Sequence, residues 1–338
     1  MLKVGIVGLG VMGRTHFRIW ASRDDVSIVA VCDCDPAAVT KAASGNLSQQ
    51  SGDVDLTGIE IYSDFEDMLS DANLDAVSIT LPTQLHAEFS IKALERGWHV
   101  LCEKPMSLDE DACNRMISAA DASGKVLLVA QCIRFWPEYA WSRKAIVERS
   151  YGALRAANFY RISSSPAWGA GSWYGDPEKS GGVTLDLHIH DVDYIQHLLG
   201  QPLALNASGT QFENGMLSHI VTDFDYGPDK VITAEASWMM SQSYGFVMGF
   251  RIMLEGASLV YDSGRTPSFQ VFPNEGEVFT PELAPGNGYN QEVAHFVDLT
   301  AGNVDSLITP SQARDSVNIA LAAARSAESK LQGNLQTT

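Results

Sequence analysis

Positive charge is scarce in this sequence. Its 338 residues include 23 Lys and Arg against 41 Asp and Glu, which gives a formal net charge of −18 at pH 7. An acidic surface repels phosphate backbones and anionic lipid headgroups, so we expect neither nucleic acid nor a membrane surface as a partner. A small uncharged molecule fits this balance better.

Long apolar runs are missing as well. No stretch approaches the roughly 20 apolar residues that a membrane-spanning helix needs. The opening residues lack the basic segment, apolar run and cleavage site of a signal peptide, so we expect none. The length exceeds that of most single cores, which predicts two domains.

Cysteines are few and do not suggest a disulfide framework. There are five, an odd number, all in the first half of the chain: Cys32, Cys34, Cys102, Cys113 and Cys132. Cys32 and Cys34 are spaced too closely for an ordinary zinc pair, and no second cysteine pair accompanies them. We expect reduced thiols, a cytoplasmic protein and no metal site.

Alternating strand-like and helix-like segments dominate the first 130 residues. Short apolar runs occur at 3–7, 27–32, 76–80, 99–102 and 126–130, with amphipathic segments between them. This alternation is typical of a doubly wound parallel sheet covered by helices on both faces. Residues 47–58 are polar and glycine-containing, and they predict a surface loop.

Longer strands with few helices dominate the rest. Strand-like runs at 154–162, 219–224, 231–238, 246–254 and 258–261 predict a mostly antiparallel sheet. Helices are expected at 183–199, 291–299 and 310–330. The fold class is therefore α/β, with a parallel domain over 1–130 and an α+β domain with an open sheet over 131–338.

A glycine pattern follows the first predicted strand directly. Gly8, Gly10 and Gly13 stand in the spacing G-x-G-x-x-G and open a helical segment whose first residues are Val11 and Met12. Glycines there permit a tight turn and close approach of a pyrophosphate, while the helix N-terminus offers unpaired N–H groups. In this context the pattern predicts a dinucleotide site.

An acidic residue follows the second strand at the expected distance. Asp33 lies 20 residues after Gly13, where a carboxylate would bind the ribose hydroxyls of a dinucleotide. The same carboxylate would repel the 2′-phosphate of NADP, and neither Cys34 nor Asp35 supplies a cation to bind one. The predicted cofactor is NAD.

A lysine follows the strand that ends at Cys102. In Glu103-Lys104-Pro105 the lysine would project from the carboxyl edge of the sheet, where ligands bind in doubly wound folds. Its ammonium could stabilise negative charge developing on a substrate oxygen. The alternative is a solvated loop lysine.

The segment 181–193 contains the densest cluster of polar side chains. On a helix Asp186 and His190 share one face, and a carboxylate beside an imidazole suits a proton-transfer pair. His188 would point away and is either a satisfied helix histidine or a group that narrows the pocket. Asp191 is interpreted as a solvated acid. Zinc binding by these four residues is disfavoured, because their side chains would diverge.

Taken together, these motifs resemble the Gfo/Idh/MocA oxidoreductases. The resemblance covers nearly the whole chain: the glycine pattern, Leu81-Pro82-Thr83-x-x-His86, Glu103-Lys104-Pro105, the Asp186-x-x-x-His190 segment and the closing 325–329. It implies a Rossmann domain followed by a domain whose open sheet mediates a dimer or tetramer. It also implies cofactor contacts from Pro82, Thr83, His86, Glu103 and Lys104.

The resemblance assigns the catalytic roles to Lys104, Asp186 and His190. It implies that His190 takes the hydroxyl proton, that Lys104 polarises the oxygen, with the base shared between them, and that Asp186 tunes its neighbours. It also implies that Asp193 binds substrate hydroxyls, and it favours a cis peptide before Pro105.

Other residues are candidates for the pocket wall. Arg134 lies at the crossover between the domains, and Trp168, Trp173 and Tyr174 lie in a loop before the glycine pair 181–182. Aromatic faces suit the C–H surfaces of sugars, although core packing explains each ring equally well.

Three functions remain open on the sequence alone. The first is oxidation of a secondary hydroxyl of a sugar, glycoside or cyclitol by NAD. The second is a redox-neutral hydrolase or lyase that uses tightly bound NAD transiently. The third is a non-catalytic NAD-binding regulator, against which the complete set Lys104, Asp186 and His190 argues.

Overall fold

The computed structural model describes residues 1–35, 37–39, 57–165 and 173–333. They form two compact units, Met1–Cys132 with Tyr289–Arg314, and Ile133–Gly288 with Asp315–Thr338. The sequence predicted contiguous domains at 1–130 and 131–338, and did not foresee that 289–314 return to the first unit. Most of the expected loop at 47–58 lies outside the described residues.

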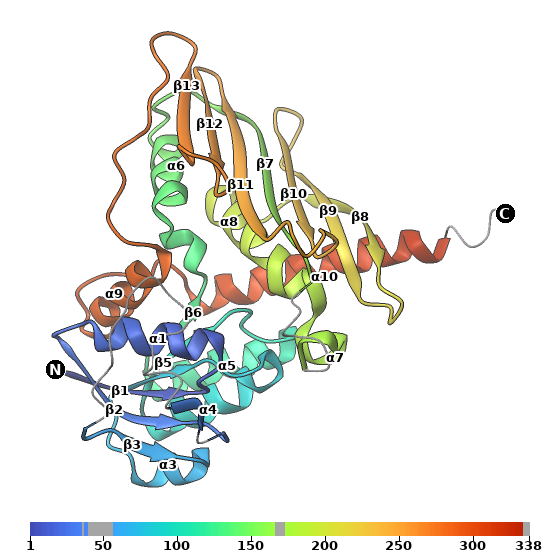
Figure 1. Cartoon of the computed structure of the whole chain (residues 1–338). Coiled ribbons are helices and arrows are strands. Elements are labelled where there is room, and N and C mark those ends of the chain that lie inside the picture. The colour runs from blue at the N-terminus through green and yellow to red at the C-terminus, as the bar shows by residue number, and fades with distance from the viewer. Residues whose placement is uncertain (36, 40–56, 166–172, 334–338) are drawn as a thin grey trace. The chain divides into compact units, whose positions relative to one another are not determined.

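The first unit contains a six-stranded parallel sheet in the order β3-β2-β1-β4-β5-β6 (Figure 1). The strands are β1 (Leu2–Val7), β2 (Val26–Cys32), β3 (Glu60–Tyr62), β4 (Ala76–Ile79), β5 (His99–Glu103) and β6 (Leu127–Ala130). This order is that of a doubly wound nucleotide-binding sheet, in which the strand order reverses between β1 and β4. The predicted fold class is confirmed.

Helices cover both faces of this sheet. They are α1 (Val11–Ala21), α3 (Phe65–Asp71), the short helix η1 (Thr83–Leu85), α4 (His86–Arg96), α5 (Glu110–Ser123) and α9 (Gly288–Thr300). Helix α9 packs beside α1, where the rings of Trp20 and Phe296 meet edge to face at 6.1 Å. This contact accounts for the return of residues 289–314 to the first unit.

The second unit is built on a seven-stranded sheet in the order β13-β12-β11-β7-β10-β9-β8. The strands are β7 (Leu154–Ser163), β8 (Ala204–Gln211), β9 (Leu217–Asp225), β10 (Val231–Ser237), β11 (Phe246–Leu254), β12 (Ala257–Asp262) and β13 (Phe269–Pro273). All neighbours are antiparallel except β7 and β10, which run parallel. The prediction of a mostly antiparallel sheet is confirmed.

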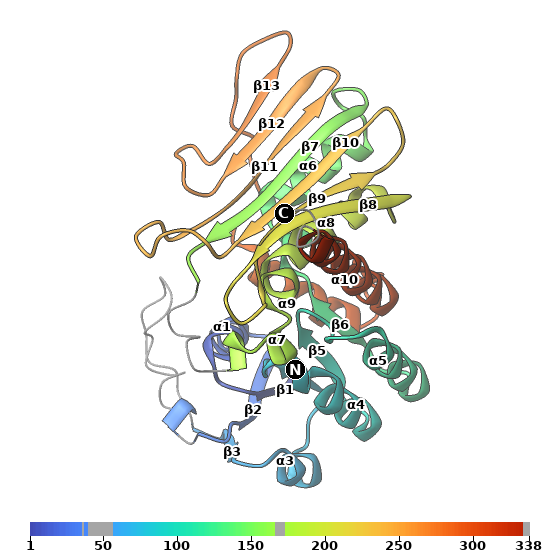
Figure 2. The same cartoon turned by 90° about the vertical axis from the view of Figure 1, so that its right-hand side faces the viewer.

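One face of this sheet is covered by helices (Figure 2). The helical segments of this unit are η2 (Cys132–Phe135), α6 (Pro137–Val147), η4 (Trp173–Gly175), α7 (Pro177–Ser180), η5 (Thr184–His188), α8 (Ile189–Leu199) and most of α10 (Pro310–Gly333). The core between helices and sheet is aromatic: Tyr139 packs edge to face on both Tyr194 and Phe250, with ring centroids 4.8 and 4.9 Å apart. The opposite face has no helix on it within the described residues.

The helix predicted at 183–199 is not regular. Its first turn, Thr184–His188, is a π-helix, and only Ile189–Leu199 is α-helical. A π-turn inserts one extra residue into the helical turn, and such turns occur frequently at functional sites. Asp186 therefore lies in an irregular turn directly before α8.

Candidate functional site

The glycine loop between β1 and α1 has the shape that a dinucleotide needs. Gly8 has φ +87°, a conformation that side-chain-bearing residues rarely adopt, and a Cβ on Gly13 would clash with the Gly8 carbonyl oxygen. A Cβ on Gly10 would meet nothing within 4 Å. Gly8 and Gly13 thus serve the turn and its packing, whereas the space over Gly10 is open for a ligand.

The N-terminus of α1 faces this open space. Its N-cap is Gly10, which offers no side chain to accept the first N–H groups, and the first turn contains no acidic residue. Val11 is 44% exposed and Met12 partly exposed. Unpaired N–H groups at a helix N-terminus bind pyrophosphate oxygens, so the residues present fit an NAD.

Asp33 connects the end of β2 to the glycine loop. Its two carboxylate oxygens accept the backbone N–H groups of Leu9, at 2.5 Å, and of Asp35, at 2.8 Å. The carboxylate is therefore fixed beside the loop, where it can also accept ribose hydroxyls. Ribose binding by Asp33 stays a prediction.

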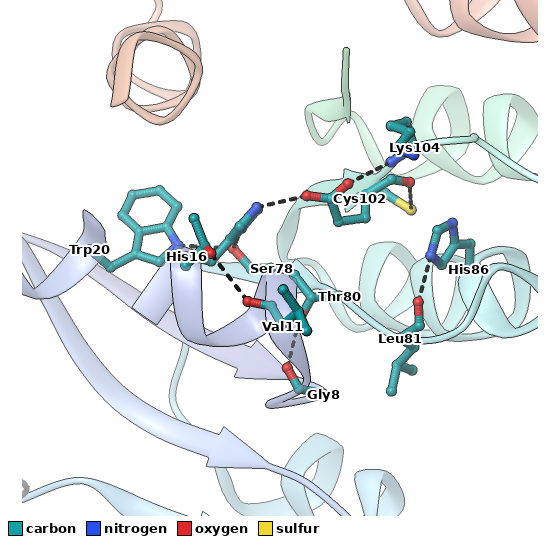
Figure 3. Close-up of polar contacts among 12 residues, drawn as sticks. Gly8, Val11, His16, Trp20, Ser78, Thr80, Leu81, His86, Cys102 and Lys104 are labelled. Carbon is teal, nitrogen blue, oxygen red and sulfur yellow. Dashed lines mark hydrogen bonds and ion pairs between the residues drawn. The ribbon is translucent and has the colours of Figure 1, made fainter. Parts of the chain in front are cut away.

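Thr80 is a loop residue that sequence analysis missed. Its hydroxyl lies 2.6 Å from the carbonyl oxygen of Gly8 and 3.0 Å from that of Val7, and thus joins the end of β4 to the glycine loop (Figure 3). Pro82 and Thr83 follow at the start of η1, with Thr83 buried. The single signal for Thr80 was a hydroxyl residue at a strand end.

His86 is completely enclosed. Its Nδ1 lies 2.8 Å from the carbonyl oxygen of Pro105 and its Nε2 lies 2.9 Å from that of Leu81. Burial lowers the pKa of this imidazole, although the two carbonyls and the Glu103 carboxylate oppose the shift. The ring is 1% exposed and connects the segments that contain Leu81 and Pro105, and a cofactor contact from His86 stays a prediction.

Lys104 stands after β5 at the carboxyl edge of the same sheet, and its side chain is partly exposed. The peptide before Pro105 is cis, as predicted. Glu103 is buried, and its oxygens accept the ring N–H of His16 at 3.1 Å and the backbone N–H of Lys104 at 3.1 Å (Figure 3). A cofactor contact from the Glu103 carboxylate would have to share these oxygens.

In the second unit, Asp186 and His190 flank the transition from π-helix to α8. Asp186 is partly exposed and His190 is 8% exposed. Tyr174 forms a side-chain hydrogen bond with Asp186, and burial together with this carboxylate raises the pKa of the tyrosine far above its usual range. Tyr174 is therefore a neutral donor that orients Asp186.

His188 and Asp191 point away from that pair. His188 is fully buried, its Nε2 lies 2.8 Å from the Thr222 hydroxyl on β9, and burial lowers its pKa to about 3. Asp191 is also fully buried and lies 3.4 Å from Arg161 on β7. His188 is thus a buried helix histidine that is satisfied through Nε2, while its Nδ1 has no hydrogen-bond partner among the described residues. The interpretation of Asp191 as a solvated acid is wrong, because its side chain is buried and forms an ion pair with Arg161.

Arg134 and Asp193 bind each other. Arg134 Nε and Nη2 donate to the two oxygens of Asp193 at 2.8 and 2.7 Å, and both side chains have 0% exposure. Ser316 Oγ lies 2.8 Å from the same carboxylate. Both residues thus use their charged groups on each other inside the second unit, and substrate contact by them stays a prediction.

The described aromatic candidates both pack at the core of the second unit, Tyr174 inside an apolar cluster and Trp173 against it. Tyr174 is 9% exposed and packs on Trp238 at 5.3 Å, within an apolar cluster of the second unit. Trp173 is partly exposed and meets Tyr174 edge to face at 5.2 Å. Trp168 lies outside the described residues.

In the part of the chain that the structure describes, no group of three or more His, Cys, Asp and Glu side chains is arranged to hold a metal ion. Within the same residues no helix is long and apolar enough to cross a membrane. The five cysteines are free thiols, four buried and Cys34 exposed.

Comparison with known proteins identifies two matching family models. Residues 2–131 match the model described as "Oxidoreductase family, NAD-binding Rossmann fold", and residues 139–260 match the "GFO/IDH/MocA C-terminal domain". Together they cover most of the chain.

Individual relatives are sugar-active enzymes by name. The chain is 28% identical to D-glucoside 3-dehydrogenase of Escherichia coli (strain K12) over 63% of its length and 58% of the relative's. It is 28% identical to 2,7-anhydro-N-acetylneuraminate hydratase of the same organism over 60% of its length and 50% of the relative's. The chain thus spans between half and three fifths of these two relatives.

Among solved structures, a levoglucosan dehydrogenase in complex with NADH and levoglucosan superposes with a TM-score of 0.81. The match covers 97% of both chains at 21% identity, which demonstrates a shared fold.

Proposed function

Because the chain belongs to the Gfo/Idh/MocA family of NAD-binding oxidoreductases, we propose that it oxidises a secondary hydroxyl of a sugar, glycoside or cyclitol. The observation that carries this proposal is the partly exposed Lys104 at the carboxyl edge of the same sheet as the glycine loop. That edge is where both the cofactor and the reacting group bind in doubly wound folds.

The proposed reaction needs a proton acceptor and a group that stabilises the oxygen. Bound NAD supplies the hydride acceptor. His190 takes the hydroxyl proton, Lys104 donates a hydrogen bond to the same oxygen, and Asp186, oriented by Tyr174, sets the local charge. Lys104 belongs to the first unit and the other groups to the second, so their meeting around a substrate is part of the proposal.

Substitution of the two reactive groups tests the proposal. Lys104→Met and His190→Asn should each lower turnover by about 10²–10⁴-fold, the usual contribution of acid–base catalysis, with NAD affinity retained. Lys144→Met, which removes an exposed lysine of α6, is the matched control. A panel of polyols and glycosides, followed by NADH absorbance, identifies the substrate. Near-normal turnover in both variants would contradict the mechanism.

A redox-neutral reaction is the second candidate, supported by the similarity to a protein named as a hydratase. In that case the same residues would oxidise a sugar transiently and acidify the adjacent C–H before reduction. Bond cleavage or hydration without net NADH formation would favour it over the simple dehydrogenase.

Domain roles, assembly and location complete the proposal. Residues 1–130 would bind NAD, and residues 131–338 would bind substrate and form a dimer or tetramer. The uncovered sheet face supports assembly, because its strands expose apolar side chains, among them Val221, Val231 and Met253 at 38–61%. Light scattering measures the assembly. Free thiols favour a reducing compartment, the cytoplasm.

A further inference from the structure

A buried chain of polar contacts runs behind Lys104 in the first unit (Figure 3). The indole N–H of Trp20 donates to Ser78 Oγ at 2.9 Å, and Ser78 Oγ lies 3.2 Å from Nδ1 of His16. Nε2 of His16 lies 3.1 Å from Oε1 of Glu103. His16 and Ser78 are 1% and 0% exposed, so no ligand reaches this chain directly.

The contacts of His16 fix the orientation of its ring. Ser78 Oγ accepts from the indole of Trp20 and also contacts Nδ1 of His16. The other ring nitrogen, Nε2, donates its hydrogen to Glu103, so both ring nitrogens have a partner. The ring thus presents a single, directed donor to the carboxylate.

Glu103 transmits this contact to Lys104. Its second oxygen accepts the backbone N–H of Lys104 at 3.1 Å. Burial alone would raise the pKa of Glu103, but the hydrogen bond from His16 and the nearby charges of His16, Lys104 and His86 hold that pKa below its ordinary value. The carboxylate is therefore ionised at neutral pH and holds the lysine by its backbone.

We propose that His16 is a positioning residue for Lys104, acting through Glu103. The inference rests on the proposed function, in which Lys104 meets the substrate oxygen. It assigns a role to a histidine three residues beyond the glycine pattern, on the buried side of α1, which neither binds NAD nor touches substrate.

Removal of the donor predicts a change in pH dependence. In His16→Leu the buried Glu103 loses one of its two hydrogen-bond donors, so its pKa should rise. Loss of a hydrogen bond to a charged group corresponds to an upward shift of about one to two pH units. At acidic pH Glu103 is then protonated and no longer anchors Lys104 as a carboxylate. We therefore expect kcat to fall at acidic pH, while NAD affinity stays unchanged.

His16→Gln is the rescue variant. A glutamine amide can donate to Glu103 and accept from Ser78, so this variant should restore kcat and its pH profile. His99→Leu is the matched control, because His99 lies at the opposite end of the same strand and accepts a backbone N–H from Val126 at 3.0 Å. It should leave the profile unchanged.

The experiment measures kcat against pH, the dissociation constant of NAD and the melting temperature for all three variants. Infrared titration of the Glu103 carboxyl band, assigned with Glu103→Gln, reports the same shift without any substrate. If His16→Leu does not fold, the comparison of His16→Gln with Glu103→Gln takes its place. His16→Gln must preserve both the Glu103 carboxyl band and the pH profile of kcat, whereas Glu103→Gln must remove the titration.

The proposal is overturned if His16→Leu lowers the melting temperature but leaves the Glu103 titration and the acid limb of kcat in place. Lys104→Met separates this result from a failure of the proposed function. Retained turnover in Lys104→Met would refute the role of the lysine itself. If Lys104→Met loses turnover but His16→Leu shows no shift in the Glu103 titration or in the pH profile of kcat, only the positioning role of His16 is refuted.

Discussion

The buried ion pair of Arg134 and Asp193 in the second unit offers a sharp test of whether these residues stabilise the fold or bind substrate. Arg134→Met removes a guanidinium that makes two hydrogen bonds, of 2.7 and 2.8 Å, to Asp193. Methionine fills much of the same volume without a charge. The variant therefore leaves the Asp193 carboxylate, 0% exposed, with Ser316 as its remaining hydroxyl contact at 2.8 Å.

The expected cost follows from this burial. Exposed ion pairs contribute about 0–1 kcal/mol, whereas removing one partner of a buried pair costs about 3–5 kcal/mol, because a charge is left without compensation. Both side chains of this pair are fully enclosed, so the larger figure applies to the free energy of unfolding. Replacing both residues by apolar ones should recover part of the loss.

Urea unfolding at pH 7 measures the effect, with Arg155→Met as the control. Arg155 pairs with Glu255 at the surface, where the side chains are 52% and 47% exposed, so its loss should destabilise the protein far less than the loss of Arg134. A different result would refute this reasoning. If the free energy of unfolding of Arg134→Met lies within about 1 kcal/mol of the wild-type value while KM for the substrate rises tenfold, Arg134 is a substrate ligand.

Three further predictions concern the cofactor loop and pH. Gly10→Ala should preserve the melting temperature but weaken NAD binding about tenfold or more, whereas Gly13→Ala should destabilise the fold, because its Cβ would meet the Gly8 carbonyl. Asp33→Ser should weaken NAD binding by about 10–100-fold in a fluorescence titration and should reduce the preference for NAD over NADP. Equal affinities of the wild-type protein for NAD and NADP would contradict the assignment of NAD as the cofactor. His188 is neutral when folded, with its pKa lowered to about 3, so the unfolded chain alone binds a proton as pH falls below about 6.5. Wild type should lose about 1.4 kcal/mol of stability between neutral pH and pH 5.5 from this group, and His188→Gln should not show that loss.

The fold was predictable where periodicity is strong. The central strands of both sheets are apolar on buried faces and were found within a few residues. The missed strands, β3, β8 and β13, all lie at sheet edges. Edge strands face solvent on more sides, and β8 has a single buried residue, Ala207, so the apolar alternation that marks a strand is absent.

The site was predictable to the extent that motifs are local. The glycine loop and Asp33 depend on short spacings within one βαβ unit, and their geometry agrees with the prediction. Contacts between distant segments left no local signal. Arg134 and Asp193 are separated by 59 residues, and His16 and Glu103 by 87, so no pattern in either neighbourhood announces its partner.

These pairs give polar side chains near the motifs a structural role that the sequence did not reveal. A buried polar group is costly unless it is satisfied, and here the satisfying partner is another residue of the same unit. Glu103 is next to Lys104, and Asp193 is one helical turn beyond His190 on α8. In each unit a buried pair thus fixes the backbone next to a proposed reactive group. Substitutions in the two pairs should change stability or pH dependence first, whereas substitutions at Lys104 and His190 should change turnover first. That difference is measurable before the substrate's identity is refined.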